Sequence, residues 1–124
     1  MQDKKILVID DDAALRLAIH DYLSHNGFKN VTTVTNGAEA LACARTNIPD
    51  LIICDIAMPR MDGYTFIQEF RNDHRLKGVP VIVLTGRGEM VDIFKMAGID
   101  NYLIKPVDPK ALLARVRRLL GTTD

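Results

Sequence analysis

The residues best suited to chemistry in this sequence are three aspartates, a threonine and a lysine, all placed directly after short apolar runs: Asp10, Asp11, Asp55, Thr85 and Lys105. Clustered carboxylates repel one another and raise each other's pKa unless a cation neutralises them. An all-oxygen site with two or three carboxylates suits Mg²⁺, which keeps several waters and accepts a phosphate oxygen as a further ligand. If folding gathers these side chains, they predict a magnesium site.

The threonine and the lysine extend what such a site could do. A lysine beside clustered carboxylates can pair with one of them when the site is empty and with a phosphate when the site is full. A threonine hydroxyl can donate a hydrogen bond to a phosphoryl oxygen. Carboxylates, Mg²⁺, Thr85 and Lys105 together therefore suit the formation of an aspartyl phosphate on Asp55.

The neighbours of Asp55 indicate how that carboxylate is positioned. The run from Leu51 to Cys54 is apolar without alternation, as is typical of a strand buried on both faces. Met58-Pro59 prevents the strand from continuing, and Met61-Asp62-Gly63 predicts a turn into a helix. Because ligands of open α/β sheets bind beyond the carboxyl ends of the strands, Asp55 is expected at a functional edge.

Strands and helices are predicted to alternate along the whole chain. Strands are expected over 6–9, 31–34, 51–54, 80–84 and 102–104, and helices over 14–23, 38–44, 64–70, 90–97 and a last segment that includes 112–120. This alternation predicts a mostly parallel sheet with helices on both faces and right-handed crossovers. The carboxyl ends of parallel strands share one edge, so the polar strand-end residues are expected in one cleft.

Local signals refine this plan. Asp12 is the simplest N-cap for the first helix, Asn36-Gly37 indicates a turn, and the threonines of 31–34 suggest an edge strand. The last helix is expected to bury Leu112, Leu113, Val116, Leu119 and Leu120, and to turn outward Arg115, Arg117 and Arg118.

Composition indicates one globular domain. The chain has 124 residues, of which 48% are hydrophobic and 26% charged, which is ordinary for a soluble protein. Lys plus Arg and Asp plus Glu both total 16, so we expect no direct contact with nucleic acid or an anionic membrane. No segment reaches the length of a membrane span. Cys43 and Cys54 fall inside predicted elements, which favours a cytoplasmic protein.

The sequence resembles the receiver domain of two-component response regulators over essentially its whole length, residues 1–124. The matching segments are ILVIDDD, PDLIICDIAMPRMDG, PVIVLTG and NYLIKP. The resemblance implies a flavodoxin-like (CheY-like) doubly wound fold, with a five-stranded parallel sheet in the order 2-1-3-4-5 and helices on both faces. It also implies a cis peptide bond between Lys105 and Pro106.

The same resemblance implies a metal and an acceptor. Asp55 would be the phosphoacceptor. Asp11 would bind Mg²⁺ directly and Asp10 mainly through water, with Asp55 and the backbone carbonyl of Ala57 completing the protein ligands.

It further implies how the signal enters and leaves. A histidine kinase or a histidine phosphotransfer protein would donate the phosphoryl group, which Thr85 and Lys105 would hold. Thr85 and Tyr102 would act as the switch, and a downstream effector protein or a fused output domain would read the face formed by 90–97, 102–104 and the last helix. The domain would be a signalling module instead of an enzyme, catalysing only its own phosphotransfer and autodephosphorylation.

Two alternatives are weaker. Haloacid-dehalogenase-type Mg²⁺-dependent phosphohydrolases also use an aspartyl phosphate, a threonine and a lysine, but they resemble one another in a D-x-D motif. Here Ala57 stands at the second aspartate position, and the acidic pair precedes Asp55. An adaptor that has lost phosphorylation is the other alternative, and the intact set of strand-end residues argues against it.

Overall fold

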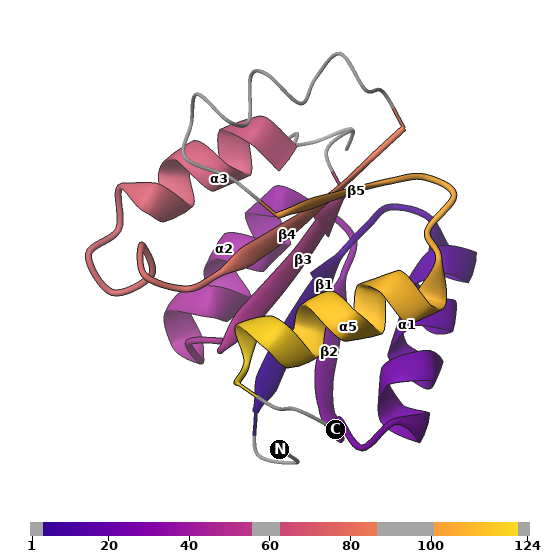
Figure 1. Cartoon of the computed structure of the whole chain (residues 1–124). Helices are drawn as coiled ribbons and strands as arrows, with labels where there is room; N and C mark the ends of the chain where they lie inside the picture. Colours follow the sequence, from indigo (N-terminus) through magenta and orange to yellow (C-terminus); the bar gives the residue numbers. More distant parts are fainter. Residues whose placement is uncertain (1–3, 56–62, 87–100, 122–124) are drawn as a thin grey trace.

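The computed structural model describes residues 4–55, 63–86 and 101–121. Its strands form one five-stranded parallel sheet in the order β2-β1-β3-β4-β5 (Figure 1). The strands are β1 (Lys5–Ile9), β2 (Asn30–Val34), β3 (Leu51–Asp55), β4 (Val81–Thr85) and β5 (Tyr102–Ile104). The predicted fold class and strand order are confirmed, and the threonine-containing strand β2 lies at an edge.

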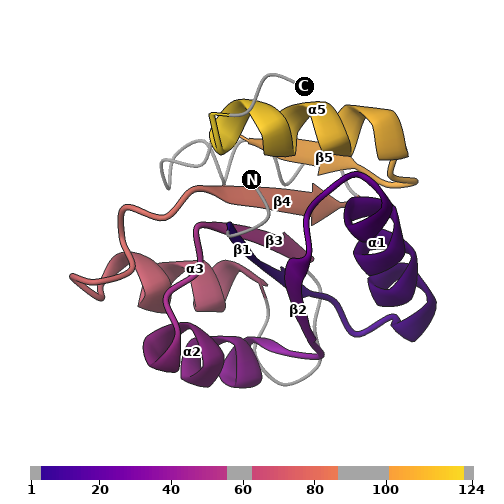
Figure 2. The same ribbon diagram turned by 90° about the horizontal axis from the view of Figure 1, so that it is seen from below.

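Helices cover both faces of this sheet. Helices α1 (Ala13–His25) and α5 (Pro109–Leu119) lie on one face, and α2 (Gly37–Thr46) and α3 (Gly63–Arg71) lie on the other (Figure 2). The helix predicted over 90–97 lies outside the described residues. No helix of the described ranges has the length and apolar character needed to cross a membrane.

The unbroken apolar runs of the central strands follow from this two-sided covering. In β1, Ile6 and Val8 belong to the core beneath α1 and α5, whereas Leu7 and Ile9 belong to the core beneath α2 and α3. Strands β3 and β4 alternate in the same way, because successive side chains of a strand point to opposite faces. Each fully buried aliphatic side chain contributes about 1.5–3 kcal/mol to folding, so the strand register is strongly specified.

Helix starts are fixed by capping side chains. Asp12 accepts hydrogen bonds from the backbone N–H of Ala14 at 2.9 Å and of Leu15 at 3.3 Å, which confirms it as the N-cap of α1. The turn predicted at Asn36-Gly37 needs correction. Asn36 is the N-cap of α2, where its side chain accepts from Glu39 N at 2.9 Å, so the helix begins directly at Gly37.

The polar face predicted for α5 also differs from the structure. Leu112, Leu113 and Val116 are buried as expected, but Leu119 and Leu120 are only half-buried. Arg115 and Arg117 are half-buried instead of turned outward. Arg115 lies along β5, because its Nη1 donates to the carbonyl of Tyr102 at 3.4 Å.

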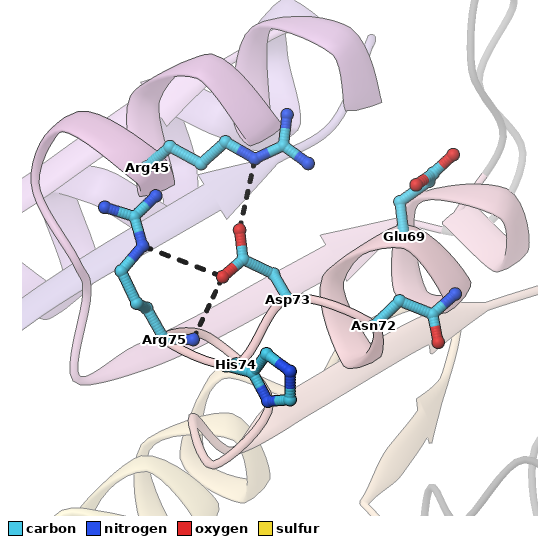
Figure 3. Close-up of a pocket in the computed structure, with 6 residues that line it drawn as sticks. All are labelled: Arg45, Glu69, Asn72, Asp73, His74 and Arg75. Carbon is cyan, nitrogen blue, oxygen red and sulfur yellow. Dashed lines mark hydrogen bonds and ion pairs between the residues drawn. The ribbon is translucent and has the colours of Figure 1, made fainter.

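The link between α3 and β4 is anchored far from the acidic edge. Asp73 Oδ2 lies 3.3 Å from Arg45 Nε on α2, and Asp73 Oδ1 accepts from Arg75 N at 2.9 Å (Figure 3). These residues belong to an open pocket lined by Arg45, Glu69, Asn72, Asp73, His74 and Arg75. Leu76, in the same segment, is fully buried, so this segment is a packed connection.

Candidate functional site

The acidic edge of the sheet is built by the pairing of β1 with β3. Ile9 is paired in register with Cys54, so the residues that follow them, Asp10 and Asp55, emerge side by side. Asp10, Asp11 and Asp55 each offer a carboxylate oxygen, and these atoms all lie within 4.8 Å of one another. Asp10 is 0% and Asp55 4% exposed, whereas Asp11 faces solvent.

Lys105, which follows the carboxyl end of β5, brings a positive charge to these carboxylates. Its Nζ lies 3.1 Å from Asp55 Oδ1 and 3.5 Å from Asp10 Oδ2. The peptide bond between Lys105 and Pro106 is cis, as predicted. Burial of Lys105 by itself lowers its pKa, but the hydrogen bond to Asp55 and the charges of Asp10 and Asp55 outweigh this and raise the pKa above its usual 10.5. Lys105 is therefore a firmly protonated partner of the cluster.

Asp10 shows why this cluster suits a metal ion. Its Oδ1 accepts from Asp12 N at 2.9 Å, whereas its buried Oδ2 has no hydrogen-bond partner among the described residues. Burial raises the pKa of Asp10 above 3.8, and the charges of Asp55 and Asp11 add to this, although the Asp12 N–H and Lys105 oppose it. One lysine does not neutralise three carboxylates, so this donor set fits a divalent cation that prefers oxygen ligands.

Thr85 reaches the same edge as the last residue of β4. It is fully buried and pairs in register with Ile104, and its carbonyl accepts from Lys105 N at 2.7 Å. The main chain of Thr85 thus fixes where Lys105 leaves the sheet. Tyr102 pairs with Val83 on the same strand pair and is half-buried against the core beneath α2 and α3.

Some predicted residues lie outside this description. Ala57, whose carbonyl is the expected fourth metal ligand, and the expected output helix over 90–97 lie beyond the described ranges. The site that the structure describes therefore consists of Asp10, Asp11, Asp55, Thr85 and Lys105.

One residue that contacts this site is not among those that the sequence predicts. Arg16, in the first turn of α1, donates from Nη1 to the carbonyl of Asp10 at 2.7 Å. A cation near a helix N-terminus opposes the helix dipole. An arginine in the first turn of a helix, where its charge is unfavourable, indicates that a nearby group compensates for it. This signal could have pointed to a hydrogen-bond acceptor in the preceding acidic turn, which is the Asp10 carbonyl.

Comparison with known proteins gives a consistent result. A family profile described as "Response regulator receiver domain" matches residues 6–117. The chain is 41% identical over 125 residues to "Probable transcriptional regulator ycf27" of Porphyra purpurea, covering 99% of this chain and 50% of that protein. It is 35% identical over 124 residues to "Chemotaxis protein CheY1" of Helicobacter pylori, covering 97% of this chain and 99% of that protein.

Solved structures agree with the sequence matches. The chemotaxis protein CheY4 of Vibrio cholerae superposes with a TM-score of 0.86 and 34% sequence identity, covering 94% of this chain and 98% of that one. The chain spans about half the length of the first curated relatives that it matches.

Proposed function

Because the chain belongs to the family of response regulator receiver domains, we propose that Asp55 is its phosphoacceptor and that Mg²⁺ binds beside it. The chain is a signalling domain of the two-component type, and domains of this family generally bind Mg²⁺ through acidic residues. The observation that carries the proposal is that three carboxylates and one lysine lie together at a single sheet edge, where the buried Asp10 Oδ2 accepts no hydrogen bond from the described residues.

The proposed metal ligands are Asp10, Asp11 and Asp55, with the backbone carbonyl of Ala57 as a further ligand. Mg²⁺, when bound, would neutralise the carboxylates and offset the charge of an incoming phosphoryl group. Asp11, which faces solvent, would approach the ion directly, and the buried Asp10 mainly through water.

The transfer itself would be a displacement at phosphorus. An Asp55 carboxylate oxygen forms a bond to the phosphorus of a phosphohistidine, the phosphorus–nitrogen bond breaks, and the imidazole leaves with the electron pair. Lys105 Nζ, 3.1 Å from Asp55 Oδ1, would then pair with a phosphoryl oxygen, and the Thr85 hydroxyl would donate to another. Autodephosphorylation would follow when water attacks the same phosphorus and restores the Asp55 carboxylate.

The donor would be a histidine kinase or a histidine phosphotransfer protein. Helix α1 begins at the acidic edge and carries Leu17, which is 62% exposed, beside the small exposed side chains of Ala13 and Ala14. In this proposal, the apolar surface at the start of α1, which follows the Asp10-Asp11 turn, contacts the helix that presents the phosphohistidine. Both cysteines, Cys43 and Cys54, are free thiols, which favours placing this exchange in the cytoplasm.

The output would be read by a downstream effector protein or by a fused output domain. The named transcriptional regulators among the relatives are about twice as long as this chain, which favours a fused output domain. In this proposal, Thr85 and Tyr102 transmit the phosphorylation state to that partner. The haloacid-dehalogenase alternative gains no support, because this chain matches the receiver-domain family and a relative is named a response regulator.

The proposal is tested by locating the phosphoryl group. The protein is incubated with MgCl₂ and acetyl phosphate, and labelled peptides are identified by mass spectrometry. Asp55→Asn should abolish labelling and EDTA should suppress it, whereas Asp21→Asn, at an exposed aspartate of α1, should leave it unchanged. Labelling of Asp55→Asn at full yield would show that Asp55 is not the acceptor.

A further inference from the structure

We propose that Arg16 is a positioning residue for the metal site, because its guanidinium fixes the peptide plane that joins Asp10 to Asp11. The inference rests on the proposed function, since it concerns how these two residues are presented to Mg²⁺. Arg16 Nη1 donates to the Asp10 carbonyl at 2.7 Å, and the bond is partly buried.

The peptide between Asp10 and Asp11 is the one piece of backbone shared by both proposed ligands. Rotating this plane changes ψ of Asp10 and φ of Asp11 together, and therefore re-aims the Asp11 carboxylate relative to Asp10 Oδ2. The register between β1 and β3 ends at Ile9 and Cys54, so the Asp10 carbonyl lies just beyond that ladder. Arg16 Nη1 is the donor that this carbonyl accepts from.

Hydrogen bonds also hold the residues on either side of the peptide between Asp10 and Asp11. Asp10 N donates to the Val34 carbonyl at 3.2 Å, and Asp12 N donates to Asp10 Oδ1 at 2.9 Å. Asp12 caps α1, and Arg16 N donates to the Asp12 carbonyl at 3.0 Å. Arg16 therefore binds both ends of the turn, one with its main chain and the other with its side chain.

The position of Arg16 in α1 supports a specific role. A positive charge in the first turn opposes the helix dipole, and a cation beside a metal site also repels Mg²⁺. On electrostatic grounds alone, removing this charge should tighten Mg²⁺ binding. Positioning gives the opposite expectation, since loss of a partner that orients metal ligands typically weakens metal affinity by about 10–100-fold.

Mg²⁺ affinity therefore distinguishes the two roles, because they predict changes in opposite directions. Mg²⁺ is titrated into wild type, Arg16→Met and Arg16→Lys, with binding followed by calorimetry and by amide NMR shifts. Arg16→Met keeps an unbranched stem and removes the donor, and we expect Mg²⁺ to bind about 10-fold or more weakly. Arg16→Lys can still donate to one carbonyl, so its affinity should lie closer to wild type than to Arg16→Met.

A matched control exists in the same chain. Arg71 Nη1 donates to the Lys77 carbonyl at 2.7 Å, and the two residues are six apart in sequence, as Arg16 and Asp10 are. Arg71→Met removes the same kind of bond remote from the acidic edge, and should leave Mg²⁺ affinity unchanged. If Arg16→Met does not fold, Arg16→Gln replaces it, since glutamine is polar but too short to keep the bond.

The amide of Asp12 gives a readout that is separate from Mg²⁺ affinity. This N–H donates to Asp10 Oδ1 at 2.9 Å, so its chemical shift reports the orientation of Asp10 and should change in folded Arg16→Met. Unchanged or tighter Mg²⁺ binding in that variant would overturn the inference, while wild-type labelling at Asp55 would leave the proposed function standing. Wild-type protein that binds no Mg²⁺ would instead refute the metal site itself.

Discussion

Lys105 Nζ lies 3.1 Å from Asp55 Oδ1, so the proposed phosphoacceptor is already paired with the lysine that would later hold its phosphoryl group. The same ammonium lies 3.5 Å from Asp10 Oδ2. One cation thus bridges two buried carboxylates that come from different strands. This relationship leads to the first two predictions.

Lys105→Met should slow labelling of Asp55 by acetyl phosphate and MgCl₂. The variant loses a charge-assisted hydrogen bond to the phosphoryl group. Such a bond contributes about 1.5–3 kcal/mol. If this stabilisation is lost in the transition state, the rate should fall roughly 10-fold to 100-fold. The rate is measured by mass spectrometry over time. Lys110→Met, at an exposed position of α5, is the control and should label as wild type does. Equal rates for the two variants would exclude a role for Lys105 in transfer.

Asp10→Asn should have opposite effects with and without metal. The raised pKa of Asp10 means that the folded state binds a proton more readily than the unfolded state, so metal-free stability falls as pH rises from 3.8 through the folded pKa. The neutral amide cannot be charged, so Asp10→Asn should raise the unfolding free energy of the metal-free protein at pH 7. Saturating Mg²⁺ should stabilise wild type, by about 2.7 kcal/mol at 100 times its Kd, and the variant much less.

Urea unfolding in EDTA and in MgCl₂ measures the unfolding free energy without and with the metal, and so tests both predicted effects of Asp10→Asn. Asp12→Asn is the control, because asparagine also caps helices well and Asp12 is not a proposed ligand. An Asp10→Asn variant that Mg²⁺ stabilises as strongly as wild type would contradict the assigned role of Asp10.

Phosphorylation should be transmitted from Thr85 to Tyr102 and α5. Thr85 is buried at the end of β4, and its carbonyl holds Lys105 N at 2.7 Å, while Arg115 on α5 donates to the Tyr102 carbonyl at 3.4 Å. A shift of Thr85 toward a phosphoryl group would therefore pull on β5 and on α5. Amide shifts with and without beryllofluoride should change at Tyr102 and along α5.

Comparing Thr85→Ser with Thr85→Val distinguishes the contribution of the Thr85 hydroxyl from that of its side-chain packing. Serine keeps the donor, so these remote shifts should persist, whereas valine keeps the shape and should reduce them. Shifts confined to the loops around Asp10 and Asp55 in wild type would rule out this route.

Asp73→Asn should remove an acid-sensitive contribution to stability. The Arg75 N–H and the Arg45 side chain lower the pKa of Asp73 below 3.8, even though partial burial opposes them (Figure 3). A lowered folded pKa gives stability that is fully present above the unfolded pKa and is lost as pH falls through the folded value. Wild type should therefore exceed Asp73→Asn in unfolding free energy at pH 7, and the difference should shrink below about pH 3.8.

Urea unfolding at a series of pH values measures that difference directly. Asp21→Asn changes an exposed aspartate whose side chain pairs with the half-exposed His20 at 3.2 Å. This variant is the comparison and should show little effect at pH 7. If the difference in unfolding free energy between wild type and Asp73→Asn does not change with pH, the charge of Asp73 does not stabilise the fold through Arg45 and Arg75.

The strands and their polar ends were predictable because both signals are local. A strand buried on both faces must be apolar at every position, and 51–54 and 81–84 show this directly in the sequence. A parallel sheet then places all carboxyl ends at one edge, so Asp10, Asp55 and Thr85 could be grouped without coordinates. The strand order came from the resemblance to a known family, since alternation of strands and helices does not fix it.

Capping and exposure were predicted less well, because they depend on which neighbours fold against a residue. Asn36-Gly37 is a turn signal in isolation, yet here the Asn36 side chain starts a helix. Arg115 has the charge of an outward residue, but its long stem lies along β5 and its head group reaches a main-chain carbonyl.

By itself, the sequence determined the fold class and the set of groups that meet at the acidic edge, because hydrophobic periodicity and strand ends are properties of short segments. Only the tertiary structure decided that Asp10 Oδ2 accepts no hydrogen bond from the described part of the chain, that Lys105 pairs with both Asp10 and Asp55, and that Arg16 donates to the Asp10 carbonyl. These are relationships between individual atoms of separate elements. Their distances are set by how a helix and neighbouring strands pack together, which residue type and spacing do not specify.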